Sequence, residues 1–393
     1  MKIAVLTSGL LPIPALQGGA VENLVDFYLE FNEQKKIHHI TVFSVIDKKI
    51  PRNLISNTLH THYIFFRTDR LSYKFKRKIF GFLNKKTFYY HYHIEYYLYK
   101  ALKKLKNKKY DVIILENRPG YARKVYDMCS ESRLVLHLHN DLLSIESNDA
   151  SSIKSNLSSV ITVSDYIKKR VADVEPYKPV NTCYNGIDLS LFETNISKSN
   201  TRIELNVKQN DFVIVYSGRL IPEKGVRELL QAMQYLDDLP LKLLIIGGDF
   251  FGDNVVVTDY MKDLYKIASV YKDRIIFTGF VPYDKIPGYL QCADACVIPS
   301  LWEDPCPLSC IEGMAAGLPM IVTLSGGMPE LVDDRCAFVL EKSSNLPLDI
   351  AEAIKYLFYH PVKRIEMSVA AKKRSLQFSK ERYANNFFEL LAQ

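Results

Sequence analysis

The sequence predicts an α/β protein with two domains, each built on a parallel β-sheet covered by helices. At 393 residues, the chain is too long to fold around a single hydrophobic core of ordinary size. In both halves, short apolar runs of strand length alternate with segments of helical periodicity, which is the pattern of parallel βαβ units. Between the two series lies a polar stretch without hydrophobic periodicity, residues 192–210. The sequence shows no fixed short repeat, so we expect one fold type used twice and not a solenoid.

The first half is expected to begin with a buried strand at residues 2–7, followed by a loop and a helix at residues 20–31. A signal peptide is disfavoured here, because the segment carries a single Lys2 and is interrupted by Pro12 and Pro14. Further strands are expected at residues 39–45, 63–66, 111–115, 133–138, 160–163 and 180–184, with a helix at residues 91–106 and another capped by Ser164.

The second half restarts the same alternation after the polar stretch. Strands are expected at residues 212–217, 241–246, 274–278, 295–299 and 320–323, and helices at residues 225–235, 259–271 and 283–291. One more helix should end at Gly317, where glycine suits a left-handed helix end, and a helical tail covers residues 350–393. The expected domains are therefore residues 1–191, residues 192–375, and a closing helix at residues 376–393 that packs back on the first domain.

Composition is that of a globular protein, with 48% hydrophobic and 24% charged residues. No apolar run approaches the roughly 18 residues of a membrane span. Seven cysteines, an odd number, fit a reducing compartment, so we expect a cytoplasmic protein. Two C-x3-C pairs suggest zinc, but their members fall in four different predicted elements, which favours buried thiols over a metal site. These cysteines are Cys292, Cys296, Cys306 and Cys310.

The net charge of +7 is concentrated in one segment, residues 67–109, which holds 14 Lys and Arg residues against Asp69 and Glu95. This segment is also rich in Tyr and Phe. The favoured interpretation is a surface that docks on anionic lipid, which would bring the protein to the inner face of the cell membrane. The alternative is a solvated helix pair whose aromatic underside packs on the sheet. Nucleic acid is not expected as a partner, because the sequence shows no module that binds DNA or RNA.

Two loops of the first half could reach a ligand. The pair Gly18 and Gly19 precedes the helix at residues 20–31 and places bare amides where an anion could bind, although a plain helix entry explains it equally well. A dinucleotide site is disfavoured, since the loop lacks the G-x-G-x-x-G pattern. Polar residues also follow two strands, with Glu116 after one and His139 after the other. We interpret His139 as a site residue and His137, inside its strand, as packing.

The stretch at residues 299–330 combines strand, loop, helix N-terminus, strand and glycine loop, which is how an α/β sheet builds an anion site at its carboxyl edge. Asp304 on the loop and Glu312 in the helix are separated by seven residues, so both could face a polyhydroxylated ligand. Exposed amides near Leu308 and Ser309 would then face a phosphate.

A second cationic loop follows the first strand of this half. Arg219 and Lys224 lie five residues apart in the segment SGRLIPEKG. An arginine fork together with a lysine point charge suits a nucleotide diphosphate, whereas the bland alternative is two solvated cations.

Taken together, the segments SGRLIPEKGV, GMAAGLP and SGGMPELV resemble the donor-binding signature of family 4 retaining glycosyltransferases. The resemblance implies the GT-B fold, in which two Rossmann-like domains face each other across a cleft, the second binding the donor and the first the acceptor. The first acid of the signature is usually Glu. Here that position is Asp304, preceded by Glu303, so either acid could reach the sugar.

The resemblance also implies roles for individual residues. Arg219 and Lys224 would meet the leaving diphosphate, Glu312 would hold the ribose hydroxyls, and His139 would lie beside the donor sugar. The remaining donor-binding residues that the family's pattern implies are Gly18, Gly19, Gly218, Gly247, Phe280, Val281, Glu303, Leu308 and Ser309, with Asp304 among the catalytic residues.

The expected reaction is transfer of a hexosyl group from a nucleotide diphosphate sugar, UDP being favoured, to a hydroxyl of a lipid-linked or surface glycan, with retention of configuration. We expect no cofactor and no metal, because no Asp-x-Asp follows a strand to hold a divalent ion between phosphates. Two alternatives stay open: a nucleotide-sugar 2-epimerase of the same fold, and a partner subunit that binds the donor without catalysis.

Overall fold

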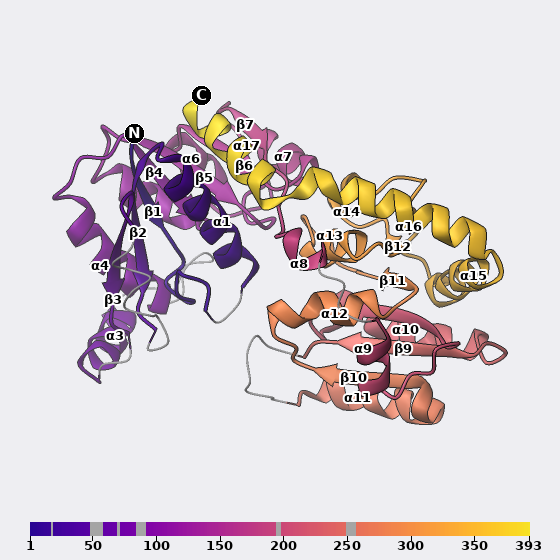
Figure 1. The fold of residues 1–393 in the computed structure, drawn as a ribbon. Coiled ribbons are helices and arrows are strands. Elements are labelled where there is room, and N and C mark those ends of the chain that lie inside the picture. Colours follow the sequence, from indigo (N-terminus) through magenta and orange to yellow (C-terminus); the bar gives the residue numbers. More distant parts are fainter. Residues whose placement is uncertain (17–18, 48–57, 69–70, 84–91, 194–197, 249–256) are drawn as a thin grey trace. The chain divides into compact units, whose positions relative to one another are not determined.

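The computed structural model describes the chain except residues 17–18, 48–57, 69–70, 84–91, 194–197 and 249–256 (Figure 1). Two compact units emerge, one formed by residues 1–184 with 381–393 and the other by residues 185–380. The chain therefore leaves the first unit several residues before the boundary expected at residue 191, and each unit is described by itself.

A seven-stranded, wholly parallel sheet forms the centre of the first unit, in the order β3-β2-β1-β4-β5-β6-β7. Its strands are β1 (Lys2–Leu6), β2 (His39–Val45), β3 (Thr61–Phe66), β4 (Val112–Glu116), β5 (Arg133–Leu138), β6 (Ser159–Thr162) and β7 (Val180–Thr182). The strand order reverses at β1, which pairs with β2 on one side and β4 on the other. Ligands of open parallel sheets bind beyond the carboxyl ends of the strands at such a reversal.

Helices cover both faces of this sheet: α1 (Ala20–Lys35), α3 (Leu71–Leu83), α4 (Tyr92–Leu105), α5 (Ala122–Tyr126), α6 (Ala150–Ser155), α7 (Asp165–Ala172) and α17 (Lys380–Ala392). Alternate residues of β1 enter separate cores, Ala4 with helix α4 and Val5 with α1 and α17. This is the two-residue period of a strand buried on both faces. The last helix, α17, packs beside α1 (Figure 1), where Phe387 stacks on Tyr28 at a centroid distance of 4.6 Å.

The second unit repeats the plan with six parallel strands in the order β10-β9-β8-β11-β12-β13. They are β8 (Phe212–Ser217), β9 (Leu241–Ile246), β10 (Ile275–Gly279), β11 (Ala295–Ile298), β12 (Met320–Thr323) and β13 (Ala337–Leu340). Both sheets have Rossmann strand order, so the predicted α/β fold with two parallel sheets is confirmed. The equivalent reversal lies between β8 and β11.

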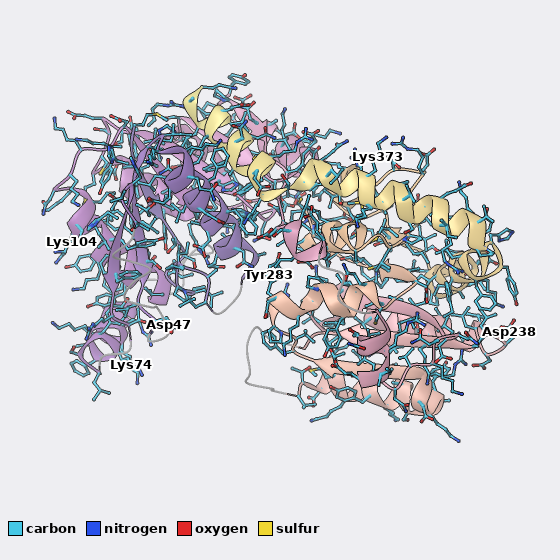
Figure 2. The ribbon with its side chains drawn as sticks, in the orientation of Figure 1. Asp47, Lys74, Lys104, Asp238, Tyr283 and Lys373 are labelled. Atoms are coloured by element: carbon cyan, nitrogen blue, oxygen red, sulfur yellow. The ribbon has the colours of Figure 1, made fainter. Side chains whose placement is uncertain are left out.

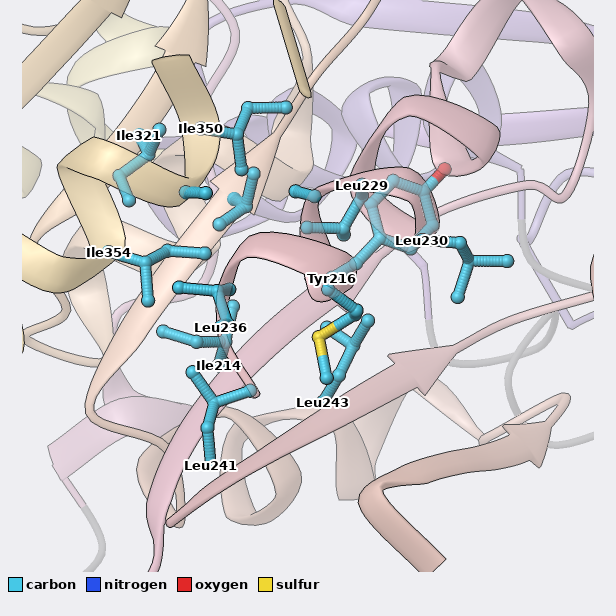
Figure 3. Close-up of a cluster of buried hydrophobic side chains, with 14 of the residues drawn as sticks. Ile214, Tyr216, Leu229, Leu230, Leu236, Leu241, Leu243, Ile321, Ile350 and Ile354 are labelled. Carbon is cyan, nitrogen blue, oxygen red and sulfur yellow. The ribbon is translucent and has the colours of Figure 1, made fainter. Parts of the chain in front are cut away.

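The helices of the second unit are α8 (Ser190–Glu193), α9 (Lys198–Glu204), α10 (Val226–Ala232), α11 (Asp259–Ala268), α12 (Ile286–Gln291), α13 (Leu308–Ala315), α14 (Met328–Leu331), α15 (Leu346–Tyr359) and α16 (Pro361–Ser375). Short 3₁₀ turns lie at residues 119–121, 222–224, 233–235, 269–274, 283–285 and 376–378. Figure 3 shows the core, in which Ile214 of β8 and Leu241 of β9 lie below Ile354 of α15.

Two elements differ from the sequence-based expectation. Helix α9 falls inside the polar stretch that we expected to be irregular. Its Arg202 is only 2% exposed and donates hydrogen bonds to the carbonyl oxygens of Cys292 and Asp211 and to the Asp294 carboxylate, so a buried guanidinium anchors it where an apolar stripe would be expected. Strand β13 was also missed, because four residues at a sheet edge carry little pattern.

Across the described ranges, no helix is both long enough and apolar enough to cross a bilayer. Figure 2 shows the basic side chains of the first unit, including Lys74 on α3 and Lys104 on α4, projecting from the ribbon. Both lysines are exposed.

Candidate active site

The predicted cationic and acidic residues of the second unit gather at the strand reversal of its sheet. Gly218 and Arg219 follow β8, while Glu303 and Asp304 lie in the loop after β11, the strand next to β8. Lys224 ends the 3₁₀ turn at residues 222–224. Adjacent parallel strands thus bring together segments that are 80 residues apart in the sequence.

An ion pair joins the two loops. The ammonium of Lys224 lies 2.5 Å from Oδ2 of Asp304, and the Ser300 hydroxyl donates to the same oxygen at 3.1 Å. The Asp304 side chain is 8% exposed and that of Lys224 18% exposed. The amides of Leu301 and Trp302 both donate to the carbonyl oxygen of Glu223, so backbone bonds hold the two loops in register.

Close backbone contact accounts for one glycine of this site. Gly225 has φ +68°, and a Cβ added there would lie 1.8 Å from the carbonyl oxygen of Pro299. Only glycine allows the start of α10 to approach the end of β11 so closely. The amide of Gly247, which follows β9, donates to the carbonyl oxygen of Gly279 at 3.0 Å. This bond keeps Gly247, a predicted donor-binding residue, at the same sheet edge.

Arg219 differs from Lys224 in its surroundings. Its side chain is exposed, and within the described part of the chain no acidic residue pairs with it. Its backbone carbonyl accepts a hydrogen bond from the Tyr216 hydroxyl at 2.8 Å, which fixes the loop and leaves the guanidinium to solvent. An uncommitted guanidinium at a sheet reversal is suited to an incoming anion.

The two neighbouring acids face different partners. Glu303 is half exposed, accepts the Gly326 amide at 2.5 Å through one carboxylate oxygen, and contacts the Lys342 ammonium through the other. Asp304 turns to Lys224 instead. The structure therefore pairs Asp304, and not Glu303, with Lys224.

Glu312, on α13, is a buried acid. It is 7% exposed, and burial raises its pKa to about 7. No hydrogen-bond donor among the described residues reaches its carboxylate. Burial and then the charge of Glu312 raise the pKa of Tyr283. A buried carboxylate without a donor is costly, so this position suits a ligand that brings hydroxyl groups.

Four other predicted donor-binding residues of the second unit lie on α13 and just after β10. Leu308 and Ser309 form the first turn of α13, which has no side-chain cap at Pro307, so their amides are available to an anion. Phe280 is exposed and Val281 half buried, both just after β10.

In the first unit, His139 follows β5 and is 7% exposed. Its Nε2 lies 3.1 Å from Oε2 of Glu116, and its backbone amide donates to Oδ1 of Asn117 at 3.1 Å. His137 also reaches Glu116, with Nδ1 3.0 Å from Oε2. The Tyr28 hydroxyl donates to Oε1 at 2.9 Å. Our interpretation of His137 as packing therefore missed a hydrogen bond.

The protonation of this cluster follows from burial and charge. Burial and then the neighbouring His137 lower the pKa of His139 to about 4, so the ring is neutral near pH 7. Burial alone would raise the pKa of Glu116, but the two imidazoles outweigh it and hold that pKa at about 2. Glu116 is thus an anion that accepts hydrogen bonds from its neighbours.

One group in the described part of the chain has ligand atoms close enough together to hold a metal ion. These atoms, all within 4.8 Å of one another, belong to Glu116, His137 and His139. The sequence did not point to this cluster, because the pairing of Glu116 with His137 is a register between β4 and β5 that local pattern does not give. Polar residues at paired positions of two buried strands must satisfy one another.

The predicted glycine pair is only partly described. Gly18 lies outside the described residues. Gly19 precedes α1, and a Cβ added there would lie 2.3 Å from Oε2 of Glu22, a residue that is 9% exposed and has a pKa raised by burial. An acid of the chain itself therefore lies at the start of α1, where we expected an anion.

Known proteins that are similar to this chain indicate its fold class and, for one segment, a matching protein family. The chain resembles the crystal structure of Anabaena Alr3699/HepE in complex with UDP, with a TM-score of 0.76, 22% identity and full coverage of both chains. The chain therefore has the GT-B glycosyltransferase fold. Residues 197–374 match the family model "Glycosyl transferases group 1".

Relatives in sequence agree with this class. The chain is 28% identical to the putative glycosyltransferase YtcC of Bacillus subtilis, over 95% of this chain and 87% of that protein. It is 26% identical to the lipopolysaccharide 1,2-N-acetylglucosaminetransferase of Salmonella typhimurium, over 72% of each chain.

Proposed function

We propose that this protein transfers a hexosyl group from a nucleotide diphosphate sugar, with UDP favoured, to a hydroxyl of a glycan or lipid-linked acceptor, with retention of configuration. The observation that carries the proposal is the pair Arg219 and Lys224 at the strand reversal of the second unit, together with the buried Glu312 on α13. Two cations and a buried acid without a donor there match a diphosphate and a ribose. A UDP complex of a protein with the same fold and the lipopolysaccharide relative support the donor and the acceptor.

The chemistry follows from where charge develops. As the glycosyl bond breaks, the sugar becomes oxocarbenium-like and negative charge grows on the leaving phosphate. Arg219 and Lys224 stabilise that charge together with the amides of Leu308 and Ser309, so the mechanism we propose needs no metal. The leaving phosphate takes the proton of the acceptor hydroxyl on the same face of the sugar, which accounts for retention.

The remaining residues orient the donor. Glu312 accepts hydrogen bonds from the ribose hydroxyls, and Phe280 and Val281 contact the base. Asp304, held by Lys224, reaches the sugar. Gly218 and Gly247 give the diphosphate close access to the backbone. The roles expected for His139, Gly18 and Gly19 stay predictions.

A donor-dependent assay tests the proposal. Purified protein is incubated with UDP-sugars and GDP-sugars, first alone and then with bacterial glycolipid acceptors, and products are followed by mass spectrometry and NMR. Transfer with an unchanged anomeric configuration is expected, with slow hydrolysis when no acceptor is present. An epimerised donor would establish the 2-epimerase alternative, and binding without turnover would establish a non-catalytic subunit.

We propose further that the first unit contacts an anionic membrane, which would present a lipid-linked acceptor. The helix α3 carries an exposed apolar stripe, with Leu71 84%, Phe75 66% and Ile79 45% exposed. Lys74 and Lys78 lie between them and are exposed as well. Basic residues flanking an apolar helical stripe suit the interface of an anionic bilayer.

A further inference from the structure

Arg118 follows β4 in the first unit, and its guanidinium is not committed to the protein. The side chain is half buried, and its Nε–H is buried without a hydrogen-bond acceptor among the described residues. Within the same part of the chain it forms no ion pair. Arg170, another half-buried arginine of this unit, instead pairs with Glu146 at 2.7 Å. A buried donor without an acceptor is costly, so the position of Arg118 calls for a partner from outside the described chain.

The main chain on both sides of Arg118 is held in place. Asn117, which precedes it, has a left-handed backbone with φ +54°. The amide of Asn117 donates to the carbonyl oxygen of His137 at 2.8 Å, and its Oδ1 accepts the amide of His139 at 3.1 Å. Pro119, which follows, disfavours the helical region for Arg118, and the observed φ and ψ are −133° and 72°. The point from which the arginine side chain projects is therefore fixed.

A buried turn supports the arginine from its other side. Pro119, Gly120 and Tyr121 form a 3₁₀ turn, and the Tyr121 amide donates to the carbonyl oxygen of Arg118 at 3.0 Å. The Tyr121 hydroxyl donates at 3.4 Å to the carbonyl oxygen of Ser8, in the loop after β1. The strand order of the sheet reverses at β1, and β4 is its neighbour. Arg118 therefore lies at the sheet edge where open parallel sheets bind their ligands.

The chemistry of this position indicates an oxyanion as the partner. A guanidinium is a planar, positively charged fork of donors that matches the oxygens of phosphate or carboxylate. The carboxylate of Glu116 does not pair with it, because three other side chains already meet that carboxylate. An arginine whose main chain is fixed before the ligand arrives loses less freedom on binding, which favours a bidentate contact.

We propose that Arg118 binds the phosphate group of a phosphorylated acceptor, namely a glycan joined to its lipid through phosphate or diphosphate. This inference rests on the proposed function and narrows its acceptor to one that carries phosphate. Phosphate is favoured over carboxylate because the exposed apolar stripe of α3 and its lysines suit a lipid, and a phosphate link presents the anion in every acceptor molecule. The assignment uses residues of the first unit alone.

A structural role toward Glu22 is the competing explanation. Burial raises the pKa of the Glu22 carboxyl, and the positive charge of Arg118 opposes that rise. No hydrogen bond or ion pair joins the two side chains in the part of the chain that the structure describes. A counterion of Glu22 would stabilise the folded chain, whereas an unsatisfied donor that awaits a ligand would not. The stability of Arg118 variants therefore separates the two explanations.

Binding is measured first, by NMR on the full chain labelled with ¹⁵N-arginine and saturated with UDP, so that phosphate probes do not enter the donor site. The Nε–H signal of Arg118, identified by its loss in Arg118→Lys, should shift with geranyl diphosphate and stay in place with geraniol. A shift caused by UDP alone, or no shift with geranyl diphosphate, would overturn the proposal. An equally strong response to inorganic pyrophosphate or to geranate would assign the site to a free anion or a carboxylate, and would overturn it as well.

Variants then test the fork by calorimetry with geranyl diphosphate. Arg118→Gln should weaken binding about 10- to 100-fold, because it removes charge-assisted hydrogen bonds to the phosphate. Arg118→Lys keeps the charge without the fork and should lie between. Arg123→Gln, which changes an exposed arginine of α5, is the matched control and should bind as the wild type does. An equal loss in the control would reduce the effect to general electrostatics and contradict the assignment.

The melting temperature decides about Glu22. It should stay unchanged in Arg118→Gln, and a clear fall together with unchanged binding would establish the structural role instead. If Arg118→Gln does not fold, the titration of the wild type and the affinity of Arg118→Lys still decide.

Transfer kinetics with a diphosphate-linked glycolipid acceptor complete the test. Arg118→Gln should raise KM for the acceptor about tenfold or more and change KM for the UDP-sugar less than about twofold. Arg219→Gln should show the opposite division, with its main effect on kcat. An unchanged acceptor KM in Arg118→Gln would overturn this inference and leave the proposed glycosyl transfer intact. If the wild type transfers no sugar, the proposed function fails, and the binding measurement still decides whether Arg118 holds phosphate.

Discussion

The ammonium of Lys224 lies 2.5 Å from Oδ2 of Asp304, and this ion pair ties the loop after β8 to the loop after β11. Arg219, in the same loop as Lys224, has an exposed guanidinium. Sequence analysis expected both cations to meet the leaving diphosphate, but their surroundings differ. Lys224 is held in an ion pair within the second unit, whereas the guanidinium of Arg219 faces solvent.

Arg219→Gln should separate catalysis from stability. Because its side chain is exposed, the change should leave the melting temperature within about 1 °C. Loss of a cation that meets the leaving diphosphate should lower kcat about 100- to 1,000-fold. Differential scanning fluorimetry and steady-state kinetics measure the two effects. Lys262→Gln, an exposed lysine of α11, is the matched control, and a loss of activity as large in the control would argue against a specific role.

Lys224→Gln should lower activity and stability together. It removes the partner of a carboxylate that is 8% exposed, so the free energy of unfolding should fall by about 1–3 kcal/mol. Chemical denaturation followed by fluorescence measures it. Asp304→Asn in the same background should recover part of the lost stability, since it neutralises the unpaired acid. A double variant no more stable than Lys224→Gln would contradict the ion pair.

The two neighbouring acids should differ in their effect on transfer. Asp304→Asn should lower kcat/KM by about 100-fold or more, because it disturbs Lys224 and the group we place at the sugar. Glu303→Gln should retain most activity, since its carboxylate lies with Gly326 and Lys342. Transfer rates with a single UDP-sugar decide between them. The reverse order would mean that Glu303 is the acid that reaches the donor.

The buried Glu312 predicts a pH-dependent stability. Burial raises its pKa from 4.5 to about 7, so the folded chain binds the proton more tightly than the unfolded chain. Its contribution therefore favours folding least when it is ionised, and the free energy of unfolding falls as pH rises from about 4.5 to 7, by about 3 kcal/mol in total. Glu312→Gln should be more stable than wild type at pH 8 and close to it at pH 5 by urea unfolding. Parallel curves for the two proteins would refute this.

Ligand binding should reverse that preference. Ribose hydroxyls donate to the ionised carboxylate, so UDP should bind more tightly as pH rises from 5.5 to 8 and should release protons near pH 7. Calorimetry in two buffers with different ionisation enthalpies detects the released protons. Glu303→Gln should keep this behaviour, whereas Glu312→Gln should lose it.

Gly225→Ala should damage the second unit through a close contact. The added Cβ would meet the Pro299 carbonyl at 1.8 Å, and we expect a loss of at least about 2 kcal/mol in unfolding free energy. Gly317→Ala is the control, because it shares a positive φ of +75° but its nearest neighbour is Ser368 Oγ at 3.5 Å. It should cost only about 1 kcal/mol, the conformational part. Equal losses would show that backbone conformation, and not proximity, decides.

The exposed stripe of α3 should mediate membrane binding. Replacing Leu71, Phe75 and Ile79 by Ser should abolish co-sedimentation with vesicles that contain anionic lipid and leave the melting temperature unchanged. A matched triple change on α16, at Val362, Ile365 and Val369, removes three side chains of similar exposure from the second unit. It should leave binding intact. Equal binding to anionic and neutral vesicles by the wild type would count against the proposed contact.

The local pattern of the sequence was sufficient for most of the fold. The strands at residues 39–45, 133–138, 212–217, 241–246 and 320–323 were predicted with their observed bounds, because buried parallel strands are continuous apolar runs. Helix α9 and strand β13 were not predicted. The buried Arg202 anchors α9, and β13 is a short strand at the edge of its sheet. Such elements depend on partners distant in the sequence.

The sequence by itself determined the two parallel sheets, the loops that carry Arg219, Lys224 and Asp304, and the helix that carries Glu312, because the positions of strands, helices and loops follow from local hydrophobic pattern and turn residues. Only the tertiary structure decided what each side chain faces. It separated Asp304 from Glu303, left Glu312 buried without a donor, and brought Tyr28, His137 and His139 onto Glu116. Pairing across a sheet and the return of α17 bring together residues up to several hundred positions apart, and no local pattern encodes such contacts.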